Sequence, residues 1–143
     1  MGLFRRTLRL AWEGPQTALG VAVLGVEAAR RRIVQLEVED GRLVVESTGT
    51  GVSLGHVVFW SRENSRWHDL DLRNRAHELG HTKQSRLLGP LYLPVVGLPS
   101  ISRVAYAFAY RELTGKQWNG YYDGYPENWA DRLGGVVRGR SPF

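Results

Sequence analysis

The sequence contains no cysteine, and lysine is scarce as well. The lack of cysteine excludes disulfide bridges, cysteine zinc ligands, iron–sulfur clusters and catalysis by a thiol. Arginine supplies 17 of the 19 basic residues, and the formal net charge is +5. A basic chain invites a nucleic-acid or membrane-surface partner, but a bias toward arginine can also reflect genome composition. The charge alone therefore does not define a binding surface.

The chain also lacks an apolar run of the roughly 20 residues that span a bilayer. Residues 17–26 are apolar and lie between arginine clusters, as in a secretory signal with residues 26–28 as the cleavage site. Glu13 and Pro15 interrupt that pattern, so we expect instead a helix that starts at Pro15 and packs on the core or lies on a membrane surface. We accordingly place the protein in the cytoplasm or at the membrane periphery rather than among secreted proteins.

Three short stretches after this region predict a small antiparallel sheet. Residues 33–39 alternate between apolar and polar side chains, and Asp40-Gly41 is a strong hairpin signal. Residues 42–48 supply the partner strand, and residues 52–60 follow a second turn as a third strand. We therefore predict about three strands paired as an antiparallel meander.

Three later segments carry helical signals and end at residues that stop helices. Residues 71–88 contain no proline and end at a Gly-Pro pair, and residues 101–114 end at a glycine. Residues 127–133 follow a proline and end at a Gly-Gly pair. Between the first two helices, residues 91–100 are apolar and interrupted by prolines, which predicts a buried loop and core segment.

The first of these helices contains the sequence His77-Glu78-Leu79-Gly80-His81. Residues i and i+4 share one face of a helix, so both imidazoles can reach a single Zn²⁺. Glu78 projects beside that face, where a carboxylate can take the proton of a metal-activated water. Gly80 costs about 1 kcal/mol in a helix interior, and the close approach of another backbone strand is one reason to tolerate it. The alternative is a polar helix face with solvated histidines.

A catalytic zinc site uses three protein ligands, so the third must come from elsewhere in the fold. The carboxylates downstream of the motif are Glu112, Asp123, Glu127 and Asp131. Glu127 and Asp131 lie at i and i+4 on the last predicted helix, so both can face the motif helix. Glu127 could then bind zinc, while Asp131 accepts the other ring N–H of a ligating histidine. The alternatives are a glutamate that interacts with the helix dipole and an aspartate that pairs with a nearby arginine.

The two motifs together resemble the gluzincin metallopeptidases, the thermolysin-like branch of the zincins. The matching segments are residues 77–81 and the sequence Glu127-x-x-Ala130-Asp131. In that family the two motif histidines and the downstream glutamate bind zinc. The resemblance therefore implies one Zn²⁺ per chain, held by His77, His81 and Glu127. It also makes Glu78 the general base and Asp131 the support of the first histidine.

The resemblance further implies a fold and a substrate class. The fold would be a minimal zincin-like α+β domain, with the sheet of residues 33–60 packed on the motif helix and on two or three further helices. The substrate would be a peptide or protein, and residues 52–60 resemble the edge strand along which zincins bind extended peptides. Residues 51–55, 84–100 and 129–135 also resemble a group of small uncharacterised bacterial proteins, a likeness that covers most of the chain from Pro15 onward and brings no known substrate with it.

Several side chains are candidates for stabilising negative charge in the transition state. Gluzincins often use a tyrosine upstream of the ligand glutamate, and Tyr121, Tyr122 and Tyr125 occupy that region here. The remaining histidines, His56 and His68, could also stabilise an oxyanion. The alternatives are aromatic packing for the tyrosines and structural roles for the histidines.

The length of 143 residues predicts a single core. We divide the chain into a helical and basic N-terminal segment (1–32), a zincin-like domain (33–137) and a loose tail (138–143). No nucleic-acid partner is expected, because the chain lacks a helix-turn-helix, an aromatic-interleaved basic strand and a zinc finger. The basic N-terminus could associate with a membrane, and the oligomeric state is open. The alternative function is a zincin-like scaffold that binds zinc without efficient catalysis and acts as a binding module.

Overall fold

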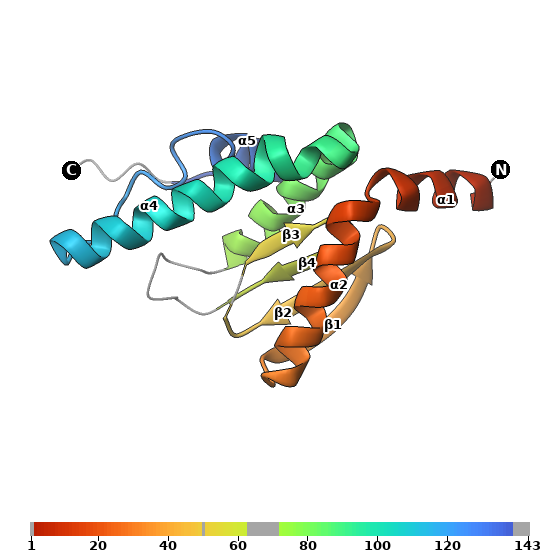
Figure 1. The fold of residues 1–143 in the computed structure, drawn as a ribbon, viewed down its shortest axis with the longest axis horizontal. Helices are drawn as coiled ribbons and strands as arrows, with labels where there is room; N and C mark the ends of the chain where they lie inside the picture. Colours follow the sequence, from red (N-terminus) through yellow and green to blue (C-terminus); the bar gives the residue numbers. More distant parts are fainter. Residues whose placement is uncertain (1, 50, 63–71, 139–143) are drawn as a thin grey trace.

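The computed structural model describes residues 2–49, 51–62 and 72–138 and has an α+β fold (Figure 1). The α-helices of this described part are α1 (Gly2–Trp12), α2 (Gly14–Ala29), α3 (Leu72–Leu88), α4 (Leu98–Thr114) and α5 (Glu127–Gly134). The strands are β1 (Ile33–Glu39), β2 (Arg42–Ser47), β3 (Val52–Leu54) and β4 (Val57–Trp60). A 3₁₀ turn, η1 (Gly89–Leu91), and a π-helical turn, η2 (Leu93–Gly97), connect α3 to α4.

The strands form one mixed sheet in the order β1-β2-β4-β3. Strands β1 and β2 are antiparallel, and Asp40 and Gly41 form the turn between them with positive φ angles, as the hairpin signal predicted. Strand β4 is parallel to β2 and antiparallel to β3. The predicted antiparallel meander is therefore wrong beyond the first hairpin.

The predicted third strand, residues 52–60, is two strands because the chain reverses at Gly55. This glycine has a φ of +64°, in the left-handed region that favours glycine, so β3 and β4 pair across a two-residue turn. Thr17 of α2 lies against the turn, where its hydroxyl accepts a hydrogen bond from the His56 N–H at 3.1 Å. The reversal leaves β3 at the edge of the sheet and places β4 beside β2.

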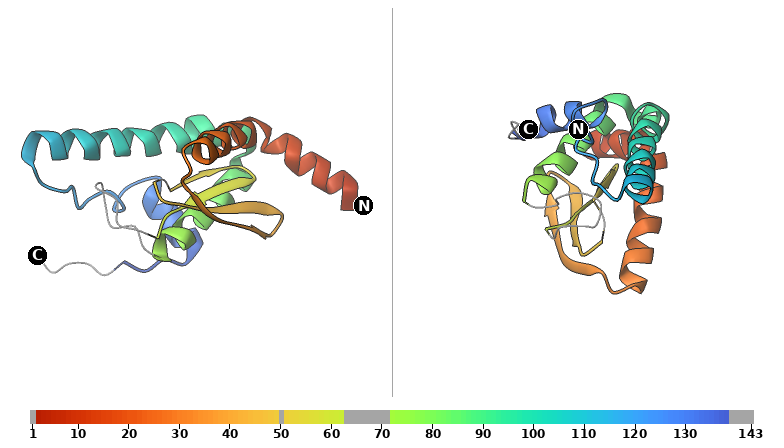
Figure 2. Two further views of the ribbon diagram at one scale, coloured as in Figure 1. Left: turned by 90° about the horizontal axis from the view of Figure 1, so that it is seen from below. Right: turned by 90° about the vertical axis from the view of Figure 1, so that its left-hand side faces the viewer.

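The sheet packs between α2 and α3 (Figure 2). Because side chains alternate along a strand, β2 and β4 contribute one apolar cluster to each face. Leu79 of α3 covers one cluster, whereas Val23 and Leu24 of α2 cover the other. The buried members are Val44, Val58 and Trp60 on the α3 side and Val45, Val57 and Phe59 on the α2 side. This packing fixes α3 and its motif residues on the sheet.

The predicted helices are confirmed, with small shifts at their ends. Helix α2 has Pro15 in its first turn, α3 is described from Leu72, and α5 spans the last predicted helix. The predicted loop over residues 91–100 is wrong, because these residues form helical turns and the start of α4. Pro94 and Pro99 are the second residues of η2 and of α4.

Helices α1 and α4 extend from opposite ends of the molecule, and α5 packs along α3 (Figure 1). Within residues 2–49, 51–62 and 72–138, no helix has the length and apolar character needed to cross a membrane.

Candidate metal centre

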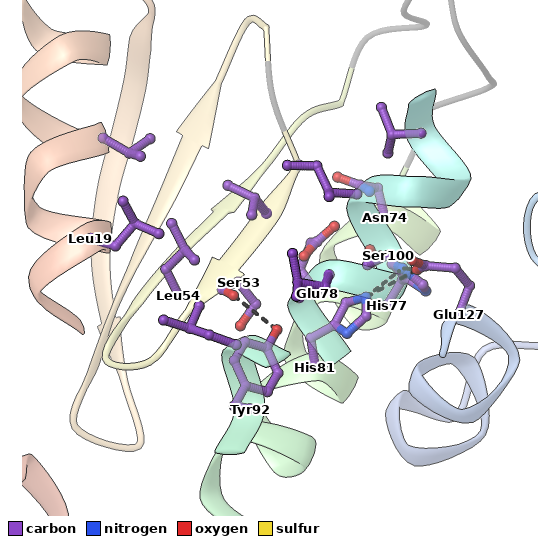
Figure 3. A pocket seen from close by; sticks show the side chains of 18 of the residues that line it. Leu19, Ser53, Leu54, Asn74, His77, Glu78, His81, Tyr92, Ser100 and Glu127 are labelled. Atoms are coloured by element: carbon purple, nitrogen blue, oxygen red, sulfur yellow. Dashed lines mark hydrogen bonds and ion pairs between the residues drawn. The ribbon is translucent and has the colours of Figure 1, made fainter. Parts of the chain in front are cut away.

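His77 and His81 lie one turn apart on α3, and their rings face the same side of the helix (Figure 3). Their Nε2 atoms are 3.2 Å apart, and the ring centroids are 4.7 Å apart in an edge-to-face arrangement. Both side chains are buried. The alternative of solvated histidines on a polar face is therefore wrong.

Glu127, the first residue of α5, completes the group. Its Oε2 lies 2.9 Å from Nε2 of His77 and 3.1 Å from Nε2 of His81. These three buried residues form a group that could hold a metal ion. Glu112 and Asp123, the other carboxylates considered as the third ligand, are exposed and do not belong to the group.

Two glycines allow α5 to approach α3 this closely. A Cβ added at Gly80 would overlap the backbone oxygen of Ala130, and one added at Gly134 would overlap the backbone oxygen of Ala76. Any side chain at either position would push the two helices apart. The expected reason for Gly80, a close backbone approach, is thus confirmed, but the approaching backbone belongs to a helix rather than to a strand.

Hydrogen bonds on the far side of each imidazole orient the two rings. Asp131 Oδ1 lies 2.7 Å from His77 Nδ1, and Arg138 donates to both oxygens of Asp131 at 2.6 and 3.0 Å. Gln84 Oε1 lies 2.6 Å from His81 Nδ1. Asp131 therefore contacts the first motif histidine as predicted, and it also pairs with an arginine.

The sequence pattern did not predict Gln84 and Ser100 as site residues. Gln84 lies three residues after His81 and hence on the same face of α3, so its spacing was an available signal. Ser100 of α4 donates its hydroxyl to Glu127 Oε1. These two residues are 27 positions apart in the chain, and no local pattern connects them.

The donor atoms have the chemistry and spacing of a divalent metal site. Each Nδ1 faces an oxygen acceptor, so a neutral ring carries its proton there and presents the Nε2 lone pair to Glu127. Three lone-pair atoms then face one another, an arrangement that a cation stabilises. In a tetrahedral Zn²⁺ site with bonds of about 2.0–2.1 Å, ligand atoms lie roughly 3.3 Å apart. The distances of 2.9, 3.1 and 3.2 Å between the three atoms are close to that value.

Without a cation, the group stabilises a proton. Burial opposes the charged form of His77, but hydrogen bonds to Asp131 and Glu127 outweigh burial and raise the pKa of His77 to about 9. Burial also opposes ionisation of Glu127, but hydrogen bonds from both histidines hold its pKa well below the usual range. A bound metal would displace the proton, because histidine ligates through a neutral ring.

Glu78 is buried beside the group. Within the described part of the chain, its Oε2 has no hydrogen-bond partner. Burial raises the pKa of Glu78, although His81 and His77 counteract this shift. A buried carboxylate oxygen without a partner is an open acceptor for a water or a substrate proton.

A cavity of about 880 Å³ lies over these residues (Figure 3). The three residues of the metal group and Glu78 contribute polar atoms to its lining. Apolar side chains from α2, β3, the η1–η2 region and α4 make up most of the remainder, among them Leu19, Leu54, Tyr92, Leu98 and Ile101. A ligand in the cavity would therefore contact polar groups in one region and apolar side chains elsewhere.

The three candidate tyrosines occupy different places. Tyr121 and Tyr122 line the cavity, and the ring of Tyr122 meets that of His77 edge-to-face, with the centroids 5.1 Å apart. Tyr125 is exposed and is not among the residues that line the cavity; its hydroxyl donates to the Val95 carbonyl at 2.6 Å.

Of the other two histidines, only His56 lies in the described part of the chain, and it does not belong to the metal group. His56 lies in the β3–β4 turn, with its Nε2 3.5 Å from a carboxylate oxygen of Glu13, and His68 lies outside the described residues. Tyr92 is a lining residue that the sequence pattern did not single out. It is buried, and its hydroxyl donates to the Ser53 carbonyl of β3 at 2.9 Å.

Comparison of this chain with protein-family models, with curated proteins and with solved structures finds no match. The resemblance to gluzincins therefore rests on the two sequence motifs, residues 77–81 and 127–131.

Proposed function

We propose that this protein is a small zinc-dependent endopeptidase of the gluzincin type. The observation that carries the proposal is the buried group of His77, His81 and Glu127 with the unpartnered carboxylate oxygen of Glu78 beside it. Structural zinc sites are usually closed by four protein ligands, whereas catalytic sites have three and keep one position for water or substrate. A purely structural site also has no need of a carboxylate with an unpartnered oxygen beside it.

Each residue of the site has a distinct role in this proposal. His77, His81 and Glu127 would hold the Zn²⁺, which supplies a water of near-neutral pKa and polarises a substrate carbonyl. Glu78 would accept a proton from the water and would deliver it to the leaving amine. Asp131 accepts the Nδ1 hydrogen of His77 and thereby keeps the Nε2 lone pair directed at the metal group.

The edge of the sheet supports a peptide as the substrate. Strand β3 is an edge strand, and its residues Val52–Leu54 line the cavity beside α3. An extended peptide can add to such an edge through backbone hydrogen bonds. The Ser53 carbonyl of this edge accepts a hydrogen bond from the Tyr92 hydroxyl, which an added peptide would have to displace to pair there. Tyr121 and Tyr122 also line the cavity, and either hydroxyl would stabilise negative charge on the scissile carbonyl.

The substitution Glu78→Gln tests the proposal, because it removes the basic carboxylate and keeps the size of the side chain. We expect about one zinc per chain in both proteins and a loss of roughly 10²- to 10⁴-fold in cleavage rate, the contribution of a positioned general base. The measurements are zinc content by elemental analysis and cleavage of an unbiased peptide library by mass spectrometry. Glu112→Gln, at an exposed glutamate outside the group, is the matched control and should cleave like the wild type.

Three results would contradict the proposal in different ways. Equal cleavage by the wild type and Glu78→Gln would show that water attack does not depend on this carboxylate. Bound zinc without cleavage of any library member would favour the alternative, a zinc-binding scaffold that acts as a binding module. Unchanged zinc content in His77→Ala and Glu127→Ala would show that these residues do not bind the metal.

A further inference from the structure

All the exposed charged side chains of the two N-terminal helices and of the residues that follow them up to residue 32 are positive. Residues 2–32 contain six arginines and two glutamates. Both glutamates are buried: Glu13 is 1% exposed and pairs with Arg42, and Glu27 is 5% exposed and accepts a hydrogen bond from Ser47. The surface that this segment presents to its surroundings is therefore positive and apolar, with no exposed acidic group.

Helix α1 is amphipathic, and none of its residues is buried. At 100° per residue, its three arginines cluster on one side of the helix, and Leu3, Phe4 and Leu8 lie on the other side. These three apolar side chains are 81%, 69% and 53% exposed. Trp12, at the end of α1, holds the helix to the body by donating a hydrogen bond to the Arg86 carbonyl at 3.0 Å.

Helix α2 continues the apolar surface. It carries no charged residue from Gly14 to Val26, and Leu19, Val21 and Val26 are about half exposed. The outer face of a helix in a globular protein is ordinarily polar or charged. Helix α2 instead exposes apolar side chains, and arginines lie near both ends of the segment formed by α1 and α2. We call the exposed surface of this segment the α1–α2 surface (residues 2–32).

We propose that the α1–α2 surface binds an anionic lipid bilayer, with α1 lying in the plane of the headgroups. A helix with leucine and phenylalanine on one face and arginine on the other binds in the headgroup region of a bilayer, where its cations reach the negative headgroups. The charge argues against a second copy of the chain as the occupant. A two-fold interface would bring the same surface onto itself and place the arginines of one copy against those of the other.

The mouth of the cavity adjoins the α1–α2 surface. Leu19 and Val23 of α2 line the cavity together with Leu98 and Ile101 of α4, and the last two are exposed. Helices α2 and α4 lie on the same side of the sheet (Figure 2, left). Docking through α2 would therefore bring the cavity to the bilayer. This orientation indicates a substrate class, an inference that rests on the proposed function. The substrate is a polypeptide held at the membrane surface.

Sedimentation with vesicles tests the α1–α2 surface without reference to catalysis. We expect the full chain to bind vesicles of phosphatidylcholine mixed with phosphatidylglycerol, to bind phosphatidylcholine alone weakly, and to be released by salt. Because one arginine near an anionic surface contributes roughly fivefold in affinity, Arg9→Gln should weaken binding about fivefold. Leu8→Glu should abolish it without affecting the fold, since no residue of α1 is buried.

Two matched controls change similar residues elsewhere on the surface. Lys116→Gln removes an exposed positive charge after α4, and Val137→Glu replaces an exposed apolar residue after α5, so neither should alter vesicle binding. His77→Ala should also bind vesicles like the wild type, which separates this test from that of the proposed function. The proposal is overturned if the mixed vesicles are not bound, or if Arg9→Gln and Leu8→Glu bind like the wild type. The proposal is also overturned if the wild type binds no vesicles but self-associates, and if Leu8→Glu abolishes this self-association. That result would assign the α1–α2 surface to a second copy of the chain.

The absence of cysteine allows the docked face to be mapped directly. Single-cysteine variants Val21→Cys, Ile101→Cys and Val137→Cys would carry a fluorophore that reports local polarity. On addition of mixed vesicles, we expect a blue shift at positions 21 and 101 and no shift at position 137. A shift at 21 without one at 101 would show that the cavity faces away from the bilayer and would overturn the inferred substrate class.

Discussion

Helix α3 takes part in two buried polar clusters that differ in how their charges are matched. Near its middle, the lone pairs of His77, His81 and Glu127 converge within about 3 Å of one another. Toward its C-terminal end, the Glu13 carboxylate accepts hydrogen bonds from Arg42 at 3.1 Å and from Ser85 at 2.6 Å. The first cluster could hold a metal ion from outside the chain, whereas the second contains its own cation, Arg42.

The second cluster, Glu13–Arg42–Ser85, has a structural role that its contacts explain. It connects the α1–α2 junction to β2 and α3, and Gln16 of α2 strengthens the connection by donating to Ser85 Oγ at 3.0 Å and to the Gly89 carbonyl at 2.9 Å. Burial of charged residues therefore does not by itself identify a functional site. Unpartnered buried atoms occur in both places, since Arg42 Nε and Gln16 Oε1 also lack a partner among the described residues. The convergence of three metal-ligating atoms on one point distinguishes the metal group from the structural cluster.

The largest expected effect is the loss of stability when the structural cluster loses its cation. Arg42→Met leaves the Glu13 carboxylate buried without its cation, and breaking such a pair costs about 3–5 kcal/mol of stability. Urea unfolding should show this loss, while zinc affinity stays unchanged. Arg62→Met, which removes a largely exposed arginine paired with Glu46, is the control and should cost less than about 1 kcal/mol. An equal loss in both variants would contradict the distinction between the clusters.

Removal of the metal should have the next largest effect. An ion that binds only the folded state stabilises it by about 2.7 kcal/mol at 100 times its Kd and by about 4.1 kcal/mol at 1,000 times. We therefore expect a chelator to lower the unfolding free energy of the zinc-loaded wild type by about 2.7 kcal/mol at the lower of these zinc concentrations and by about 4.1 kcal/mol at the higher. The same treatment of Glu127→Ala should change nothing. Equal stability of the wild type with and without zinc would refute a metal site in the folded protein.

Asp131→Asn tests the outer hydrogen bond of the metal group. The amide oxygen can still accept the Nδ1 hydrogen of His77, but the negative charge that makes the ring a better ligand is lost. Changes of this kind typically lower metal affinity by about 10- to 100-fold. Competition with a chromophoric chelator measures the affinity, and Asp123→Asn, at an exposed aspartate, is the matched control. Identical affinities of the two variants would exclude a role of Asp131 in metal binding.

Ser85→Ala should have the smallest effect of the four. It removes the hydrogen bond that Ser85 donates to the buried carboxylate of Glu13 and the one that Ser85 accepts from Gln16, together worth about 2 kcal/mol. Ser102→Ala, whose hydroxyl bonds within the exposed part of α4, should cost less than about 0.5 kcal/mol. Zinc affinity should be the same in both proteins. A loss of zinc affinity in Ser85→Ala would show that the two clusters are coupled through α3.

The sequence by itself determined those parts of the protein that depend on the local geometry of the chain. The 3.6-residue period of a helix places His77 and His81 on one face, and the same period relates Glu127 to Asp131. The Asp40-Gly41 pair likewise specified the first hairpin, because the turn needs residues that tolerate positive φ. These features require no knowledge of what the segments pack against.

Only the tertiary structure decided which strands pair and which carboxylate joins the histidines. The parallel pairing of β4 with β2 was not predictable, because side chains alternate in the same way in parallel and antiparallel strands. Glu127 rather than Glu112 or Asp123 meets the motif because α5 contacts α3 where Gly80 and Gly134 have no side chains. That contact joins two helices far apart in the sequence, and the spacing of residues within either helix carries no information about it.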